Sequence, residues 1–515
     1  MLLILPLGRD FFPSIDSAEI DMHMRAPVGT RIEEAGKIAV LVNQAIERLL
    51  PGHVLNVIDN CGLPISAINQ AYNSSGTIGP QDCDVTISLR EQAAPIERYQ
   101  ATLRRGLPNL FPGTEFTFLP GDITAKILNF GLPSPIDVQV SGRDQTANMA
   151  FAQKLASRMR RIPGIADPIV EQAMDQPTLR IASARTFALG TGLTESDIAG
   201  NALSTLSGSG QVAPTYWLDT RTGVSRLVNL QTPQSQLATM GDLETVPIDH
   251  GDGNPSGTAP QLLGALSRIT QTGSALSVSH YSILPVVDIY AGNAGRDLGA
   301  VNDAVLEAIA AMRPELPRGS SIALHGQAET MGSAYRQLLG GLALAVALVY
   351  LVIVVNFQSW LDPFIIITAL PGTLAGIVWS LFLTHTTVSV PALTGAIMCM
   401  GTATANSILV VSFARERLQE HGDAVRAAVE AGYGRLRPVL MTALAMMIGM
   451  LPVSVSNTQN APLGRAVVGG LLVATFATLM FVPCVFALVH GRRHRPAPAR
   501  PEPAHDALYA MMHAR

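Results

Sequence analysis

Five long apolar segments fill the C-terminal third of the chain, and no segment of comparable length precedes them. The segments are Leu338–Phe357, Pro363–Thr384, Val390–Phe413, Pro438–Val455 and Val467–Val489. None of them contains Asp, Glu, Lys or Arg. Because a bilayer core requires about 20 apolar residues per helix, the pattern predicts a bundle of five membrane-spanning helices. The apolar start, Met1–Leu7, is too short for a signal peptide or a span. We therefore expect the front end of this membrane protein to be missing or supplied by another polypeptide.

Alternating and helical periodicities organise the region after this start. The first stretch predicts strands and helices in the order βαββαβ, the order of a ferredoxin-like unit. Its expected elements are a strand at Glu19–Arg25, a helix at Arg31–Leu50, strands at His53–Ile58 and Cys83–Leu89, a helix at Ile96–Leu107 and a strand at Glu115–Leu119.

A second stretch repeats this order around an insertion. Before the insertion we expect strands at Ile136–Val140, Asp167–Glu171 and Thr178–Ile181 and a helix at Gln145–Arg161. The insertion, Ala184–Asp249, predicts a helix at Thr194–Leu206 and strands at Val212–Leu218 and Ser225–Leu230. Strands at Ser267–Thr272, Val286–Tyr290 and Ser321–His325 and a helix at Arg296–Met312 follow. The alternative is a pair of ordinary α+β domains without duplication.

Basic residues set the expected orientation of the spans. Hydrophobic residues make up 48% of the chain, charged residues 14%, and the net charge of −4 gives no reason to expect a nucleic-acid partner. The connection between the third and fourth apolar segments contains five arginines, and Arg492, Arg493, Arg495 and Arg500 follow closely after the fifth segment. The positive-inside rule places both in the cytoplasm, and therefore places the large N-terminal region outside.

Four cysteines show no metal-binding spacing. Cys399 and Cys484 lie inside apolar segments, where cysteine behaves as a small apolar residue. Cys61 and Cys83 lie in the polar region and could pair if that region faces an oxidising compartment. Their separation of 22 residues does not fix the distance between their Cβ atoms, so the sequence leaves this pairing open.

Several local motifs together resemble one transporter family. They are GRDFFPSIDSAEIDMHMRAPVGTRIEE (Gly8–Glu34), GQAETMGSAYRQL (Gly326–Leu338), TATANSILVVSFARER (Thr402–Arg417), GRLRPVLMTALAMMIGMLP (Gly434–Pro452) and LGRAVVGGLLVATFATLMFVPCVFAL (Leu463–Leu488). As a set they are similar to the C-terminal half of a resistance-nodulation-division (RND) permease. The runs Asp59–Asp82 and Ile127–Gly142 look more like an uncharacterised acriflavin-resistance-type branch than like the best-known multidrug pumps of the family.

The resemblance implies an architecture. Residues 1–13 would be the remnant of a preceding transmembrane helix, 14–133 the first porter subdomain, and 134–183 with 256–330 the second. Residues 184–255 would be a docking insertion, 336–490 the transmembrane domain and 491–515 a cytoplasmic tail. Members of the family are trimeric, proton-driven exporters of the bacterial inner membrane that work with a periplasmic adaptor and an outer-membrane channel. We expect membrane lipids as further partners, and no cofactor, since the proton gradient supplies the energy.

Polar residues of the spans are the candidates for supporting proton transfer. The family's better-known pumps have a lysine at the position of Ala405, and their proton-carrying carboxylates belong to the other half. Thr402 and Asn406 stand four residues apart on one helix face, and Thr442 lies on the next span. We expect these and Arg437 to support carboxylates of that half; the alternative is hydrogen bonding between helices, or, for Arg437, snorkelling to the interface.

Two further sets of residues complete the candidates. Gly372 and Gly376 form a GxxxG pair that predicts close helix packing. The loop between Cys61 and Gln81 matches in position a gating loop of the family, and its apolar residues are candidates for the substrate path: Leu63, Ile65, Ile68 and Tyr72. The alternative is a solvated hairpin connection. The charged connector Arg417–Glu430 is expected to be a helix on the cytoplasmic surface.

The sequence therefore predicts half of a proton-driven RND transporter that exports small amphiphiles or drugs. The scattered methionines show no cluster suited to Cu(I), which disfavours the heavy-metal branch. No nucleophile–base pair, phosphate loop or HExxH motif indicates an enzyme. The alternatives are a truncated half that only assembles with a partner, and an RND relative that moves lipid or assists protein export.

Overall fold

The computed structural model describes residues 7–13, 18–64, 76–90, 94–121, 123–128, 132–250 and 259–491. The chain divides into two compact units. One comprises Met1–Gln172 and Val278–Arg515, and the other is Ala173–Ser277. The first unit contains two α/β parts and the long apolar helices.

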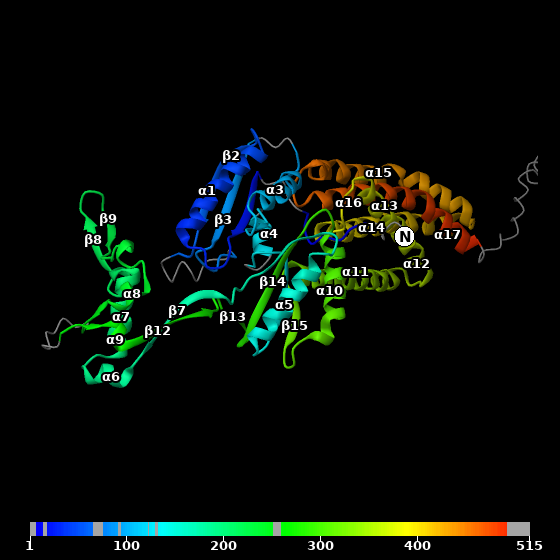
Figure 1. The fold of residues 1–515 in the computed structure, drawn as a ribbon. Coiled ribbons are helices and arrows are strands. Elements are labelled where there is room, and N and C mark those ends of the chain that lie inside the picture. Colours follow the sequence, from blue (N-terminus) through cyan, green and yellow to red (C-terminus); the bar gives the residue numbers. More distant parts are fainter. Residues whose placement is uncertain are drawn as a thin grey trace, which may run out of the picture. The chain divides into compact units, whose positions relative to one another are not determined.

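The first α/β part is a four-stranded antiparallel sheet that carries helices α1 and α3 (Figure 1). Its elements are β1 (Glu19–Arg25), α1 (Ile32–Leu49), β2 (Val54–Cys61), β3 (Asp82–Leu89), α3 (Ile96–Leu110) and β4 (Glu115–Leu119), followed by a short helix α4 (Ile123–Leu128). The strands lie in the order β2-β3-β1-β4. Alternation along β1 puts Ile20, Met22 and Met24 into one core with the buried faces of both helices. Each predicted element of this stretch is present, with ends shifted by a few residues.

The second α/β part has the same order of strands and helices with one additional strand, β13. It contains β5 (Ile136–Ser141), α5 (Gln145–Met159), β6 (Ile165–Val170), β13 (Ser279–Tyr281), β14 (Leu284–Asn293), α10 (Leu298–Met312) and β15 (Ser321–His325). Strand β14 pairs with β5, β6 and β13, and β15 pairs with β5. Two strands assigned to this part from the sequence, near Thr178–Ile181 and Ser267–Thr272, lie elsewhere. They are β7 (Gln176–Ser183) and β12 (Ser267–Ser274), which pair only with each other within the second unit.

The second unit is a small α/β assembly with its own apolar cluster. Besides β7 and β12 it contains α6 (Arg185–Gly190), α7 (Glu195–Ser207), β8 (Thr215–Asp219), β9 (Val224–Val228), α8 (Met240–Glu244), β10 (Pro247–Ile248), β11 (Gln261–Leu262) and α9 (Leu263–Leu266). Helix α7 starts at a capping box in which the Thr194 side chain accepts from the Asp197 amide and the Asp197 carboxylate accepts from the Thr194 amide. Strands β8 and β9 form a hairpin whose apolar side chains, including Trp217 and Leu227, are exposed.

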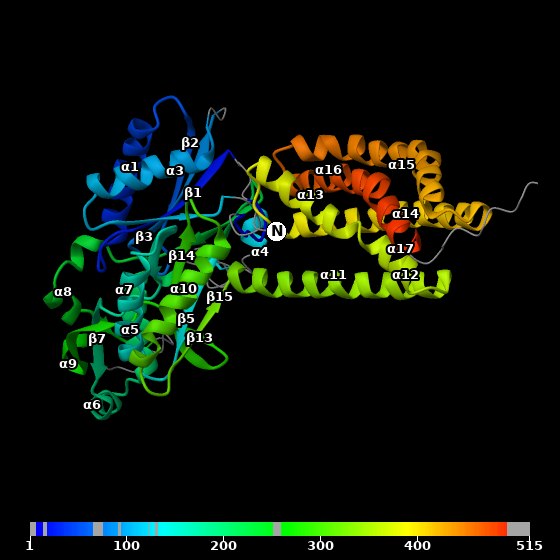
Figure 2. The same cartoon turned by 90° about the vertical axis from the view of Figure 1, so that its right-hand side faces the viewer.

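Five helical segments of the first unit are long and apolar enough to cross a membrane (Figure 2). They are α11 (Gln327–Phe357), α12 with α13 (Leu361–Ile367, Leu370–Leu383), α14 (Val390–His421), α15 (Ala424–Val455) and α16 with α17 (Ala461–Phe476, Val482–Gly491). A π-helical segment, Ala477–Phe481, joins α16 to α17. Helix α16 packs against α13, α14 and α15, so it is the centre of the bundle.

The helices extend beyond the apolar runs on which they were predicted. The expected surface helix over the charged connector Arg417–Glu430 is wrong. Helix α14 continues to His421, the chain turns at Gly422 with a left-handed φ of 73°, and α15 begins at Ala424. Only glycine adopts this backbone conformation readily, so Gly422 ends one helix and lets the next start.

Residues 7–13 attach the second α/β part to the helices. The backbone of Gly8 and Asp10 pairs with Val388, just before α14. The Asp10 carboxylate accepts from the amide of Leu298 at the start of α10, and the Tyr335 hydroxyl of α11 donates to the carbonyls of Asp10 and Val388. Asp10 thus connects α11 to α10, so a displacement of α11 would be transmitted to the start of α10.

Substitution of Gly376 should destabilise the bundle. A Cβ atom added at Gly376 would lie 2.6 Å from the Val473 Cβ and 2.8 Å from the Gly469 carbonyl oxygen of α16. We expect Gly376→Ala to lower the free energy of unfolding by roughly 1–3 kcal/mol, measured by thermal or denaturant unfolding in detergent. Gly449→Ala is the matched control, since nothing lies within 4 Å of its added Cβ. Equal effects of the two substitutions would contradict tight α13–α16 packing.

Candidate functional site

The polar face of the first sheet is buried. Residues Asp21, His23 and Arg25 alternate with the core residues of β1 and are only 7%, 3% and 7% exposed. In the register of the sheet, His23 lies opposite Asp84 and Arg25 opposite Asp82. Since the polar face of an antiparallel sheet is commonly solvated, burial requires that each of these charges find a partner.

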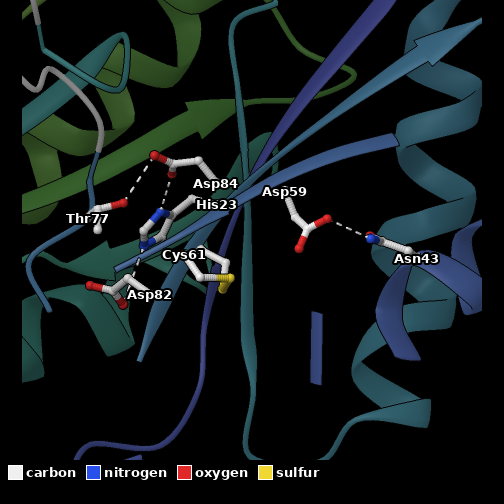
Figure 3. Close-up of a disulfide and its surroundings, with 8 residues drawn as sticks. His23, Asn43, Asp59, Cys61, Thr77, Asp82 and Asp84 are labelled. Carbon is white, nitrogen blue, oxygen red and sulfur yellow. Dashed lines mark hydrogen bonds and ion pairs between the residues drawn. A yellow bond between two sulfur atoms is a disulfide. The ribbon is translucent and has the colours of Figure 1, made fainter. Parts of the chain in front are cut away.

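His23 is held between two carboxylates of β3 (Figure 3). Its Nδ1 lies 2.8 Å from an oxygen of Asp84, and its Nε2 lies 3.7 Å from an oxygen of Asp82. The Thr77 hydroxyl donates to the second Asp84 oxygen. Burial opposes the imidazolium cation, but the neighbouring carboxylates of Asp82 and Asp84 outweigh it and raise the pKa of His23. Burial likewise opposes the Asp82 anion, but His23 and Arg25 lower the pKa of Asp82 below its usual value.

Arg25 links the first sheet to the second. Its Nε donates to Asp82 at 2.8 Å, and one terminal nitrogen donates to the carbonyl of Gly76. The other terminal nitrogen donates to the carbonyls of Val170 and Glu171, at the end of β6, each at 3.0 Å. A guanidinium has donors for all these acceptors at once, which a lysine ammonium would lack.

A second arginine makes a similar link. Arg104 of α3 forms a bidentate ion pair with Asp167 of β6, with nitrogen–oxygen distances of 2.9 and 2.8 Å. The guanidinium also lies over the Phe118 ring, 4.7 Å from its centroid. Together with Arg25, this pair fastens β6 to the first α/β part.

The disulfide that the sequence left open is present between Cys61 and Cys83. The two residues are direct partners in the β2–β3 ladder, with Cα atoms 4.0 Å apart. The bond closes the connection that contains the predicted substrate-path residues. Of these, Leu63 is 44% exposed, whereas Ile65, Ile68 and Tyr72 lie outside the described residues.

A cavity of about 220 Å³ opens beside this polar face. Its lining combines carboxylates, a lysine and apolar side chains, including Asp21, Asp84, Lys126, Leu119 and Leu132. Lys126 lies 2.5 Å from an Asp21 oxygen, and Asp84 is already hydrogen-bonded to His23 and Thr77, so both carboxylates have partners. Such a mixed polar and apolar lining suits a small amphiphilic solute.

The candidate polar residues of the helices are not brought together. Asn406 is buried in α14. Thr402, on the same helix, is half-buried and donates to the Met398 carbonyl and the Met446 sulfur. Thr442 is exposed on α15 and donates to the Val439 carbonyl of its own helix, and Arg437 is exposed. Gly372 and Gly376 lie on α13 against Ala477 and Val473.

One charged residue of the apolar helices was overlooked. Asp362 stands just before the predicted segment Pro363–Thr384, but α12 begins at Leu361 and includes it. Its side chain is 3% exposed in the structure and pairs with Arg415 of α14 at 3.4 Å and His490 of α17 at 3.3 Å. The acidic residue directly before Pro363 was the available signal. These ion pairs connect α12 to α14 and α17.

Comparison with known proteins decides the family. The sequence profile described as the AcrB/AcrD/AcrF family matches residues 1–490. The chain belongs to this family of RND permeases. It is 27% identical to the nickel-cobalt-cadmium resistance protein NccA of Alcaligenes xylosoxydans xylosoxydans over 502 residues, which covers 95% of this chain and 45% of NccA. It is 26% identical to the cobalt-zinc-cadmium resistance protein CzcA of Cupriavidus metallidurans, covering 94% of this chain and 45% of CzcA.

Solved structures show the same fold. A crystal structure of a heavy metal efflux pump superposes with a TM-score of 0.79 at 22% identity, covering 96% of this chain and 48% of the pump. This member of the AcrB/AcrD/AcrF family thus spans about half the length of the relatives it matches. The sequence predicted export of amphiphiles or drugs. These relatives do not support that substrate class, because their names describe metal resistance. Among the described residues, no group of three His, Cys, Asp or Glu side chains is arranged to hold a metal ion.

Loss of the disulfide should destabilise the first α/β part. The cross-link restricts a loop of 22 residues, for which chain entropy gives about 3 kcal/mol. We expect Cys61→Ala/Cys83→Ala to lower the free energy of unfolding by about this amount in denaturant titrations. Cys484→Ala removes an exposed free cysteine and serves as control. Alkylation of four thiols instead of two in the unreduced, denatured chain would contradict the bond.

His23 should make stability depend on pH. Because the pKa of His23 is raised, its contribution is complete below its usual pKa of about 6.5 and is lost as the pH rises through the raised value. The difference in unfolding free energy between the unmodified chain and His23→Gln should therefore shrink as the pH rises from about 6. His280→Gln, at an exposed position of β13, is the control. A difference that stays constant with pH would show that folding does not raise the pKa of His23.

Proposed function

We propose that this chain forms the C-terminal half of a proton-driven efflux permease of the bacterial inner membrane. The match of the family profile to residues 1–490 carries this proposal. The five apolar helices would anchor it, with the two α/β parts in the periplasm and the C-terminus in the cytoplasm. The disulfide supports this orientation, because disulfides persist in oxidising compartments such as the periplasm.

The two α/β parts would act as porter subdomains of ferredoxin-like type. Apart from the additional strand β13, both follow the order βαββαβ, and the first strand of each is central, β1 between β3 and β4 and β5 between β14 and β15. The second unit would supply the docking subdomain. Its hairpin β8–β9 exposes apolar side chains on a two-stranded ribbon, which is marginally stable alone in water. We infer that a neighbouring subunit of a trimer, an adaptor or an outer-membrane channel covers it.

The proton pathway would need carboxylates from the other half of the permease. Asn406 is the helical residue that we propose as their supporting partner, because it is buried in α14 next to Ala405, where the better-known pumps have lysine. Asp362 is unsuited to this role, since Arg415 and His490 already neutralise it.

Two substrate classes have one supporting observation each. The cavity lined by Asp21, Asp84, Leu119 and Leu132 favours small amphiphilic organic compounds. The names of the relatives favour divalent metal cations such as those of nickel, cobalt and cadmium.

Efflux from cells that contain both halves tests the proposal. The chain would be co-expressed with the N-terminal half of a relative in a host stripped of its own pumps. We expect several-fold lower accumulation of a fluorescent amphiphilic cation, or of nickel and cobalt, with the difference abolished by a protonophore. Asp84→Asn, which removes a carboxylate from the cavity, should raise the concentration for half-maximal transport more than Asp303→Asn, an exposed change on α10.

Each result has a defined meaning. Extrusion of the organic cation alone favours the first substrate class, and extrusion of the metals alone favours the second. If neither class is extruded, or if extrusion is independent of the proton gradient, the chain is not part of a proton-driven exporter of these solutes. Crosslinking to lipid-transfer or protein-export components would then support the remaining alternative.

A further inference from the structure

The second sheet also has a buried polar face. On β5 and β14, Asp137 lies opposite Tyr290, and Gln139 lies opposite Asp288. These four residues are only 1%, 7%, 8% and 4% exposed. Their neighbours in the strands, such as Val138 and Ile289, form the apolar face of the same sheet, on which α5 packs (Figure 2). The polar face is therefore covered as completely as the apolar one.

Amide and hydroxyl donors satisfy two of the three carboxyl groups on this face. Asp288 accepts from the side chains of Gln139 and Gln172, each at 2.9 Å. Glu171, which follows β6, accepts from Gln172 at 2.9 Å and from the Tyr290 hydroxyl at 3.2 Å. Asp137 differs from both, because its buried Oδ1 has no hydrogen-bond partner among the described residues. A buried carboxylate oxygen without a donor is costly, whereas a carboxylic acid in the same place is much less so.

The positively charged groups around these carboxyls do not neutralise the negative charge of the carboxylates. From β1, Arg25 contacts the carbonyls of Val170 and Glu171, but its guanidinium is already paired with Asp82. The nearby groups that could titrate on the remaining elements are His23 on β1, Asp84 on β3, His325 on β15, Glu329 on α11 and Tyr281 on β13. His325 lies opposite Asp137 in the β5–β15 pairing, but its Nδ1 is already 2.9 Å from a carboxylate oxygen of Glu329.

The buried polar side chains between the two sheets form a layer that contains Asp137, Glu171 and Asp288. These three carboxyls thus cannot all be ionised without separating the sheets or hydrating this layer. Burial raises the pKa of Asp137 to about 8, with Asp288 and Glu171 adding to the effect. Burial also raises the pKa of Glu171 to about 7, again with a contribution from Asp288. The raised pKa of His23 across the layer acts in the same direction, since its loss of a proton also leaves more negative charge.

We propose that Asp137 and Glu171, beside Asp288, form a proton-binding site outside the membrane-spanning helices, and that its occupancy controls the closure of the two sheets on each other. Protons on these two carboxyls limit the negative charge of the layer, and Arg25 then bridges from Asp82 to the end of β6 in a dry interface. When the protons leave to bulk water, the uncompensated carboxylates draw water into the layer and the sheets separate. A small gap lined by His23, Arg25, Glu171 and Tyr290 lies where that water would enter.

Distance measurements on the full chain in nanodiscs test the coupling. Spin labels would be placed at exposed positions of α1 and α10, as Glu47→Cys and Ala310→Cys. Cys399→Ala and Cys484→Ser remove the free thiols, and Cys61–Cys83 stays oxidised. We expect the label–label distance distribution to broaden and lengthen between about pH 6 and about pH 9, with a midpoint between the two raised pKa values.

Neutral isosteres separate this site from other titrating groups. Asp137→Asn/Glu171→Gln should keep the narrow distribution up to about pH 9, while Glu307→Gln, an exposed change on α10, should behave like the parent. The same pH-dependent change in parent and double variant would overturn the proposed coupling, as would a distribution that does not respond to pH in the parent.

Infrared spectroscopy detects the protons directly, even if a variant packs differently. Ordinary aspartate and glutamate are ionised above about pH 6, so a carboxylic-acid C=O band that persists there reports a buried acid. We expect such a band in the parent, titrating between about pH 7 and about pH 8 and weakened in Asp137→Asn. Absence of the band above about pH 6, or its full retention in Asp137→Asn, would overturn the proton site.

Discussion

The buried pairing of Arg25 with Asp82 is the interaction on which the α/β region depends. Both residues are on the polar face of the first sheet, and Asp82 is fully buried. Breaking such a pair by removing one partner costs about 3–5 kcal/mol, because the remaining charge has no solvent. The guanidinium uses its other donors on backbone carbonyls of Gly76, Val170 and Glu171. The same ion pair therefore fixes β1 to β3, the connection after residue 75, and the first sheet to the second.

Two consequences follow from burying polar faces. Each α/β part keeps an apolar core under its helices. Arg25 and Arg104 connect the two parts through hydrogen bonds and an ion pair. Contacts of this kind respond to protonation and hydration far more than apolar packing does.

The long helices follow a different principle. They associate through close backbone approach, as at Gly376 with Gly469, and through isolated polar ties such as Asp362 with Arg415 and His490. Much of α11 and α15 remains exposed in this chain. That surface is apolar, which suits contact with lipid or with helices of another polypeptide.

The sequence by itself determined the elements. Period-two alternation in Glu19–Arg25, helical spacing in α1 and the five apolar runs are local signals, and the structure contains all of them. The separation of β7 and β12 from the second sheet was decided by tertiary pairing, since alternation does not name a strand's partner. Tertiary pairing also decided that Cys61 lies next to Cys83, and that Asp137 lies near Tyr290 and Glu171. Register across strands brought these residues together, and only the fold showed that the polar sides of both sheets are buried.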